Sequence, residues 1–348
     1  MNLIGENLKK VRLLKNLSLR DAGKLLNLSP TAVSKYEKGL IVPDSTKLIE
    51  FANAYQVKTL EFLKENKRVN MQFASFRKKK RLSGKKLELL KNVIEEEVFK
   101  YLDVLELNSF ENKPKLKKYP CRSLEDAEAC ANMFRSDMLF SLYQPLSDLV
   151  NMLENIGVVI LTIKNYASMF DDFDGLSECV NDIPFIVLLG DIKDGARQRF
   201  TIAHELGHLV LNVDCQDIDE EKLCHRFASA LLMPKDAVIR EFGNSRLNIG
   251  FGELEAFKQE YKVSYAAIVY RLKDLGIIND YLYKRLSIQI NKRIGKHDPY
   301  PIPVEKSYQF QRLVCKLEAS NIISLNKACE YLGVNINEYN NQDYYYGY

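Results

Sequence analysis

A mostly apolar stretch near the middle of the chain contains two histidines four residues apart. From Thr201 to Val210 it reads Thr-Ile-Ala-His-Glu-Leu-Gly-His-Leu-Val. Residues four apart lie on one face of an α-helix, so the imidazoles of His204 and His208 can reach a single point, with Glu205 beside them. Only four histidines occur in the 348 residues, and two fall in this stretch. The pattern therefore indicates a helix that builds a shared ligand site.

Two histidines and a glutamate in this spacing are typical of zinc. Zinc takes nitrogen and oxygen ligands, and a catalytic site uses three protein ligands and leaves a fourth position open. Zinc lowers the pKa of water, and an adjacent carboxylate can accept the proton and pass it to a leaving amine. We therefore expect Zn²⁺ as the cofactor, His204 and His208 as metal ligands, and Glu205 as the catalytic base.

A third zinc ligand is expected on the next helix, which the sequence predicts from about Asp219 to Pro234. Glu221 borders its inward face, and Glu220 and His225 lie near that face. Their spacing alone does not decide which of these three residues is the third metal ligand. Lys222 and Arg226 are expected to face water. Glu221 could equally serve as an ordinary acidic residue that complements the dipole of a helix N-terminus.

Residues 1 to about 56 predict four short helices separated by tight turns. Ser18 and Ser29 are suited to cap helices, Pro30 suits a first helical position, and Gly39 suits a helix end. In the fourth helix, Leu48, Ile49, Ala52 and Tyr55 are expected to face inward. Two short helices joined by a tight turn on a basic chain end are a helix-turn-helix signature.

The second helix of such a motif enters the major groove of double-stranded DNA, and its first residues reach the bases. The predicted recognition surface is therefore Ser29, Pro30, Thr31, Ser34 and Lys35, with Val33 and Tyr36 turned towards the core. Charged donors suit phosphates, and hydroxyls suit bases or backbone. The alternative is a helical domain that packs only on protein.

The charge is distributed unevenly along the chain. Residues 1–118 carry 26 Lys and Arg against 14 Asp and Glu, whereas the remaining 230 residues carry 24 against 32. This excess favours a polyanionic partner for the N-terminal third, although a solvated helix face would show it too. The run Arg77–Arg81 is either a solvated linker or a second phosphate-contacting patch.

Cysteine usage and hydropathy exclude several classes of protein. The seven cysteines contain no CxxC pair, which disfavours a disulfide scaffold or a cysteine-only zinc site. No apolar run approaches ~18 residues, and the first residues do not resemble a signal peptide. We expect a cytoplasmic protein with no membrane partner.

The elements alternate in a way that predicts an α+β, mostly helical chain of two or three domains. Expected are a long helix over Ser83–Leu107, a helix from Ser123 to about Leu142, and buried strands over Val158–Ile163 and Phe185–Leu189. The predicted parts are 1–60, 61–119 with a basic linker and long helix, 120–290, and a helical appendage over 291–348. No internal repeat is evident.

Three segments together resemble the ImmA/IrrE family of bacterial zinc metallopeptidases. They are Pro184–Leu189, then Ala196–His208, then Glu221–Ala228 continuing through Leu231-Leu232-Met233-Pro234. The N-terminal segments Leu17–Ala22 and Val33–Gly39 resemble the XRE (Cro/repressor-like) helix-turn-helix family. Their order is that of the helix-turn-helix-fused branch of ImmA/IrrE proteins. The resemblance implies an all-α helix-turn-helix domain, then a zincin-like metallopeptidase domain with a small sheet.

The resemblance also implies roles for individual residues. It implies zinc on His204, His208 and Glu221, with Glu205 as general base, and it implies that Arg20 contacts DNA. The family usually has Ala-Asn where this chain has Cys224-His225. His225 is then expected to be a second-shell partner, an alternative ligand or a stabiliser of the transition state, and Glu220 stays open as a second-shell residue or ligand.

As a function, the resemblance implies a DNA-binding, zinc-dependent regulatory endopeptidase. Its implied substrate is a protein, a repressor of the helix-turn-helix type, whose cleavage controls transcription in stress, prophage or mobile-element circuits. The alternative is a DNA-binding regulator or antitoxin that uses the peptidase fold as a sensor or partner-binding module without turnover. The geometry of DNA half-sites favours a homodimer.

Overall fold

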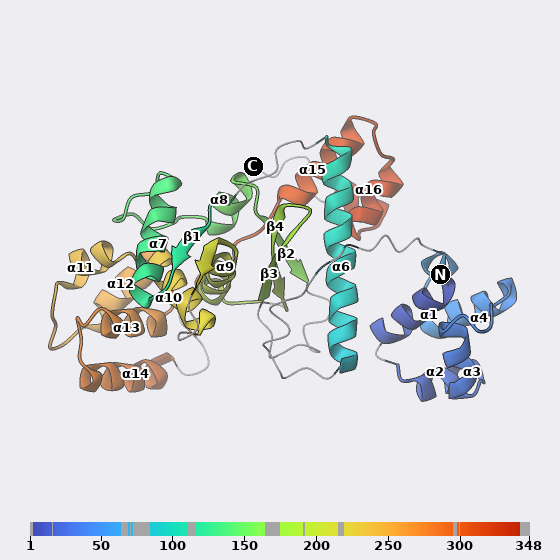
Figure 1. Cartoon of the computed structure of the whole chain (residues 1–348), viewed down its shortest axis with the longest axis horizontal. Helices are drawn as coiled ribbons and strands as arrows, with labels where there is room; N and C mark the ends of the chain where they lie inside the picture. The colour runs from blue at the N-terminus through green and yellow to red at the C-terminus, as the bar shows by residue number, and fades with distance from the viewer. Residues whose placement is uncertain are drawn as a thin grey trace. The chain divides into compact units, whose positions relative to one another are not determined.

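A computed structural model describes most of the chain in two compact units. The described residues are 3–15, 17–63, 69, 71, 84–109, 116–163, 175–190, 192–214, 219–294, 298 and 300–341. The units are Met1–Leu102 and Asp103–Tyr348. Their boundary falls inside the long helix α6, Gly84–Leu107 (Figure 1). The finer division into four parts stays a prediction, and the run Arg77–Arg81 lies outside the described residues.

The first unit contains the four expected short helices, α1 (Leu3–Leu14), α2 (Leu19–Leu26), α3 (Pro30–Glu37) and α4 (Ser45–Tyr55). A 3-10 helix that was not predicted, η1 (Thr59–Phe62), follows them. Ser18 and Ser29 cap α2 and α3 as expected, because each hydroxyl accepts a hydrogen bond from the backbone N–H three residues later. Asn27 ends α2 in the left-handed conformation at φ 52°. Local capping thus fixes the tight turn between α2 and α3.

The core of this unit is built from one stripe of each helix, including Leu8, Ala22, Val33, Phe51 and Phe62. A buried ion pair ties α1 to α3, since Arg12 donates to both carboxylate oxygens of Glu37 at 2.6 and 3.0 Å. The same arginine donates to the Leu17 carbonyl at 2.7 Å. The Arg12–Glu37 pair therefore holds the end of α3 against α1.

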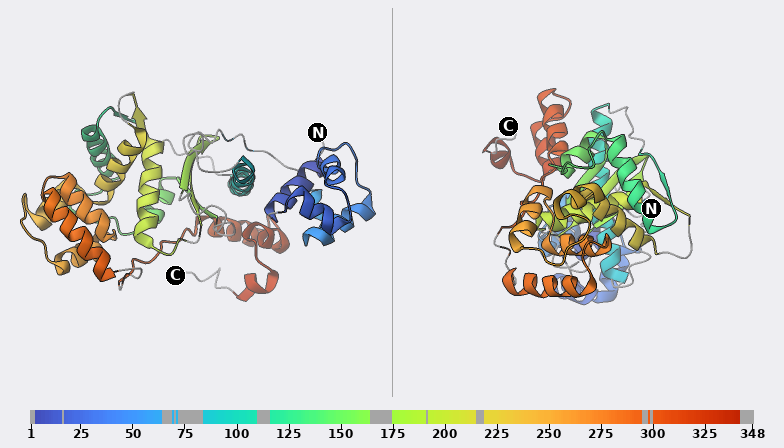
Figure 2. Two further views of the ribbon diagram at one scale, coloured as in Figure 1. Left: turned by 90° about the horizontal axis from the view of Figure 1, so that it is seen from below. Right: turned by 90° about the vertical axis from the view of Figure 1, so that its left-hand side faces the viewer.

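The second unit contains two small sheets and a set of helices. The main sheet has the order β2-β4-β3, formed by β2 (Val159–Ile163), β4 (Ile183–Leu189) and β3 (Gly175–Val180). β2 runs parallel to β4, and β3 runs antiparallel to it. A second, parallel pair joins β1 (Tyr119–Cys121) to β5 (Leu211–Val213). Helix α9 (Gly195–Val210) lies against the main sheet (Figure 2).

The helices that accompany α9 are α7 (Leu124–Asp137), α8 (Leu149–Asn155), α10 (Glu220–Leu232), α11 (Lys235–Phe242), α12 (Phe251–Tyr261), α13 (Tyr265–Asp274) and α14 (Asp280–Ile294). Helix α10 packs against α9, α8 contacts both α9 and strand β2, and the other helices of this unit up to α14 lie beyond α10 (Figure 1). One continuous hydrophobic core unites them with α9 and the sheet. The α+β, mostly helical class is therefore confirmed.

An extended segment, Tyr300–Ser307, crosses the first turns of α9. The Gly195 N–H donates to the Ile302 carbonyl at 3.0 Å, and a Cβ at Gly195 would lie 2.1 Å from the Pro303 carbonyl oxygen. Gln198 exchanges two hydrogen bonds of 2.8 Å with the backbone of Glu305. The segment, called the strap below, is thus fastened to the helix that carries the histidine pair.

The chain closes with three helices, α15 (Gln309–Ala319), α16 (Leu325–Leu332) and α17 (Ile336–Asn341), which repeat α1, α2 and α3 at a spacing of 306 residues. Ser324 caps α16 as Ser18 caps α2, and Gly333 takes the left-handed position of Asn27. The turn bond from the Leu28 N–H to the Gly23 carbonyl has its counterpart in Val334 and Cys329. This repeat was not predicted from the sequence, because few residues are identical between the two segments.

Other expectations need correction. The helix from Ser123 ends at Asp137, before Leu142, and Ile49 is exposed although it was expected to face inward. Strands β1, β3 and β5 and helices α11 and α14 were not predicted. Arg226 does not face water, because it is half-buried and pairs with Asp274 at 2.7 Å. Among the described residues, no helix is long and apolar enough to cross a bilayer.

Candidate metal centre

Helix α9 holds His204, Glu205 and His208, called the HExxH residues below, in a largely buried environment. Asp194 caps the helix, since its carboxylate accepts from the Ala196 N–H at 2.9 Å. His204 and Glu205 are 7% and 2% exposed, respectively. The helix can approach α10 closely at Gly207, where a Cβ would lie 3.2 Å from the Cα of Cys224. Glycine at this position therefore permits the two helices to bring their side chains together.

The two histidines and Glu221 converge on one point. His204 Nε2 lies 3.2 Å from one carboxylate oxygen of Glu221, and His208 Nε2 lies 3.5 Å from the other. One ligand atom from each residue lies within 4.8 Å of the others, which is the spacing that a single metal ion needs. The structure thus brings together the three residues that were expected to bind zinc.

The charges of this cluster are strongly coupled. Burial alone would lower the pKa of His208, but hydrogen bonds to Cys224 and Glu221 and nearby negative charge raise it to about 11. Hydrogen bonds from His204 and His208 hold the pKa of Glu221 well below its usual value. The negative groups around the two histidines favour a positive charge between them. A divalent cation supplies that charge when it replaces the protons on the histidines.

Glu220 contacts the opposite edge of the His208 ring. Its carboxylate lies 2.9 Å from Nδ1, whereas Nε2 faces Glu221. A carboxylate in this position fixes the tautomer and orientation of a metal-binding histidine. Cys224 also lies close enough to form an alternative ligand set with His208 and Glu220. Sequence reasoning overlooked Cys224, although its place three residues after Glu221 puts it on the same face of α10.

Strand β3 supplies the partner of Glu205. Ser177 Oγ donates a hydrogen bond of 2.8 Å to a carboxylate oxygen of Glu205. Two residues earlier, a Cβ on Gly175 would lie 2.9 Å from Thr201 Cγ2, so glycine lets the strand lie close to α9. Sequence reasoning missed Ser177, because β3 shows no alternation of apolar residues that would predict a strand.

His225 lies beside the cluster and not within it. Its ring centroid is 4.5 Å from that of His204, and the ring stacks on Phe200 at 5.7 Å with an interplanar angle of 26°. The residue is exposed, and it does not belong to the groups of side chains that could hold an ion among the described residues. This position is suited to contacting a molecule that binds next to the centre.

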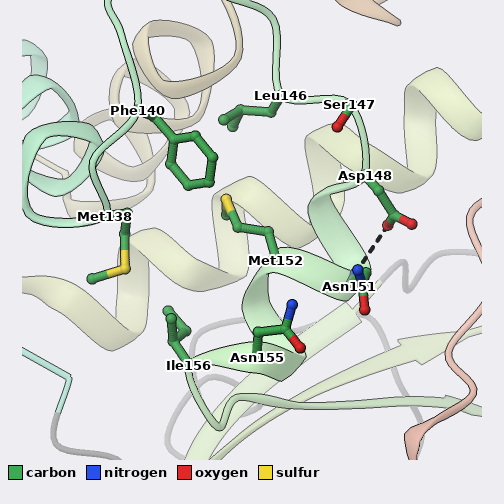
Figure 3. Close-up of a pocket in the computed structure, with 9 residues that line it drawn as sticks. All are labelled: Met138, Phe140, Leu146, Ser147, Asp148, Asn151, Met152, Asn155 and Ile156. Carbon is green, nitrogen blue, oxygen red and sulfur yellow. Dashed lines mark hydrogen bonds between the residues drawn. The ribbon is translucent and has the colours of Figure 1, made fainter.

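Two hollows differ in their relation to the centre. One, of about 640 Å³, is lined by His225, Phe200 and Thr201 and continues between α9, α10 and α13. The other, of about 310 Å³, lies along α8, and its lining includes Met138, Phe140 and Met152 (Figure 3). Its lining includes none of the HExxH residues or their partners. The larger hollow, called the groove below, is therefore the one that adjoins the candidate centre.

In the first unit, the residues expected to contact DNA lie on α2 and α3. Arg20, Ser29, Thr31 and Lys35 are exposed, and Ser34 is half-buried. Val33 is buried, and Tyr36 packs on Phe51 with ring centroids 5.4 Å apart. All the predicted contact residues except Ser34 are thus exposed, and Val33 and Tyr36 face the core as expected.

Comparisons with known proteins identify two domains. Residues 153–273 match the family model described as IrrE N-terminal-like domain, of the Peptidase_M78 family. Residues 8–62 match a helix-turn-helix model. No curated protein gives a significant match. A similar solved structure is PlcR of Bacillus thuringiensis in complex with the peptide PapR7 and DNA, at 14% identity over 98% of both chains, with a TM-score of 0.18.

Proposed function

Because this chain joins a helix-turn-helix domain to an IrrE-like domain of the Peptidase_M78 family, we propose that it is a DNA-binding zinc endopeptidase. The observation that carries the proposal is the convergence of His204, His208 and Glu221 beside a buried Glu205. A structural or retired site has no need of this carboxylate. The proposal places the protein in a reducing, DNA-containing compartment such as the bacterial cytoplasm.

The donor set fits zinc. Two imidazole nitrogens and a carboxylate oxygen within 4.8 Å form the three-ligand set of a catalytic zinc site, with Glu220 orienting His208 from outside. When bound, Zn²⁺ supplies Lewis acidity, which lowers the pKa of water and polarises a peptide carbonyl. His204, His208 and Glu221 would hold the ion, and Glu220 would act through His208.

Glu205 performs the proton transfers of hydrolysis in this proposal. Its carboxylate accepts a proton from water as the water oxygen bonds to the carbonyl carbon of the scissile peptide bond. It then gives that proton to the amide nitrogen as the C–N bond breaks, so that water is divided between the two products. Ser177 keeps the carboxylate in place by donating to one of its oxygens.

We assign DNA binding to the first unit and place its contacts at Arg20, Ser29, Thr31, Ser34 and Lys35. The helix-turn-helix match and the exposure of α2 and α3 support this assignment. The excess of Lys and Arg in residues 1–118 favours phosphate contacts. We propose a repressor-type helix-turn-helix protein as substrate, and a homodimer as the DNA-bound form.

The test combines metal content with cleavage of a panel of purified helix-turn-helix repressors from the same genome. The parent is expected to bind one equivalent of zinc and to cleave a member of the panel. His204→Ala should lose the zinc, and Glu205→Gln should keep it but cleave nothing. Cleavage by Glu205→Gln at the parental rate would overturn the mechanism, and a parent that takes up no zinc would favour the non-proteolytic regulator or antitoxin.

A further inference from the structure

The groove beside the candidate centre is an extension of it along the same two helices. On α9, Arg197, Phe200 and Thr201 precede His204 by seven, four and three residues, so they share its side of the helix. On α10, His225, Ser229 and Leu232 follow Glu221 on the corresponding stripe. The metal ligands and the groove are therefore consecutive parts of one surface.

The lining of the groove suits an apolar side chain. Its walls include Phe200, Leu232, Val263 and Ala267, and Tyr270 of α13 stands at its edge with an exposure of 56%. A hollow of about 640 Å³ is large enough for a bulky residue and part of the neighbouring main chain. Burial of such a side chain is favourable in proportion to the apolar area removed from water.

The charges at the groove are also unequal. Asp194 is engaged in capping α9, and Asp274 pairs with Arg226. Lys222 is exposed at the rim and adds positive charge there. An acidic residue next to the apolar side chain would complement this lysine.

We propose that this groove is the specificity site of the peptidase, and that it binds a substrate segment with a bulky apolar residue flanked by an acidic one. His225 stands where the groove meets the centre, 4.5 Å from the His204 ring between centroids. A neutral imidazole always carries one N–H donor, so His225 can donate to the substrate carbonyl oxygen as it gains negative charge. This inference rests on the proposed function and adds the substrate class.

The first test changes the volume of the groove. Ala267→Phe fills it from α13, and Ala266→Phe, at an exposed neighbouring position that does not line it, is the matched control. Cleavage sites are profiled by mass spectrometry on a synthetic peptide library. The parent and Ala266→Phe should prefer Leu, Phe or Met at one fixed position, and Ala267→Phe should prefer Ala or Gly there. An unchanged profile in Ala267→Phe would overturn the assignment.

A binding measurement separates this inference from the proposed chemistry. Zinc-loaded Glu205→Gln is titrated with fluorescent peptides from the same library, which vary only in the apolar residue and its acidic neighbour. Ala267→Phe in this background should weaken binding of the Leu peptide at least tenfold, and Lys222→Ala should remove the preference for the acidic residue. If the parent cleaves nothing, this titration still shows whether the groove binds the apolar residue and its acidic neighbour. Equal binding of all peptides would refute the proposed specificity of the groove.

The role of His225 is tested by two replacements. His225→Ala should lower kcat by about 10²-fold, as loss of a single oxyanion donor does, with little change in KM. His225→Asn keeps a hydrogen-bond donor and should restore part of kcat, and both should retain a full equivalent of zinc. Equal kcat in the parent and His225→Ala, or loss of zinc in both variants, would contradict contact with the substrate.

Discussion

Arg199 and Glu305, which are 106 residues apart in the chain, form a buried ion pair on helix α9. Arg199 lies five residues before His204 and nine before His208, so it is on the opposite side of the helix from the histidine pair. Its guanidinium also donates to the Leu146 carbonyl at 2.7 Å. The strap thus packs on the face of α9 that is opposite the histidine pair.

Glu305→Ala should destabilise the second unit by about 3–5 kcal/mol, because it leaves the Arg199 charge buried without its partner. It also removes the acceptor of the Val150 N–H, which now bonds to Glu305 at 3.0 Å. Urea unfolding followed by far-UV circular dichroism measures the change. Lys306→Ala, at the next and exposed position, should have almost no effect. Equal destabilisation by the two variants would show that the ion pair is not the cause.

Ser177→Ala should slow cleavage without changing the metal content. The hydroxyl donates to Glu205 at 2.8 Å, and loss of a hydrogen bond to a charged group costs about 1.5–3 kcal/mol, which corresponds to roughly 10–100-fold in kcat. Steady-state kinetics with zinc analysis of the same samples measures both quantities. Cys179→Ala, on the same strand but exposed, is the control. A parental kcat in Ser177→Ala would mean that Glu205 does not depend on this contact.

Glu154→Gln should raise stability at neutral pH but not at pH 4. Burial raises the pKa of Glu154 above its ordinary value of 4.5, despite a hydrogen bond from Ser307 and the nearby charge of Arg312. Between 4.5 and the raised pKa, the folded protein keeps a proton that the unfolded chain has released, so stability falls as pH rises through this window. The amide that replaces the carboxyl group in the variant does not titrate. Melting temperatures of both proteins from pH 4 to 8 should therefore diverge as pH rises, and parallel curves would refute the burial penalty.

Lys35→Ala should weaken DNA binding about equally for all sequences and reduce the magnitude of the salt slope by about one. Lys35 is exposed on α3, next to the residues expected to reach the bases. Fluorescence anisotropy with a labelled duplex at a series of salt concentrations measures the slope. Lys58→Ala, which changes an exposed lysine before η1, should leave it unchanged. If both substitutions change the slope alike, the contact is not local to α3.

The sequence predicted those parts of the fold that depend on local chemistry. Ser18, Ser29 and Pro30 mark helix starts through contacts made within four residues, so the starts of α2 and α3 agree with the prediction. His204 and His208 lie on one helix, and its 3.6-residue period alone brings them together. Glu221 lies on a second helix, so its approach depends on how α9 and α10 pack at Gly207.

Features that depend on long-range packing were not predictable. Ile49 lies one residue from the inward Leu48, and only the packed unit shows that the buried stripe continues through Phe51 and Ala52 instead. Ser177 reaches Glu205 from a strand 28 residues earlier. Arg226 was expected in water because no sequence rule brings Asp274 next to it.

The helices α1–α3 and α15–α17 share a backbone geometry but differ in surface charge, two properties that usually occur together in DNA-binding proteins. The side-chain caps that begin α2 and α3, the left-handed residue after α2 and the hydrogen bonds of the α2–α3 turn recur at α16 and α17. Yet residues 3–35 carry seven Lys and Arg against two Asp and Glu, whereas residues 309–341 carry three of each. Backbone geometry therefore places no demand on surface charge, and one tri-helical scaffold can be basic or electrically neutral within a single polypeptide.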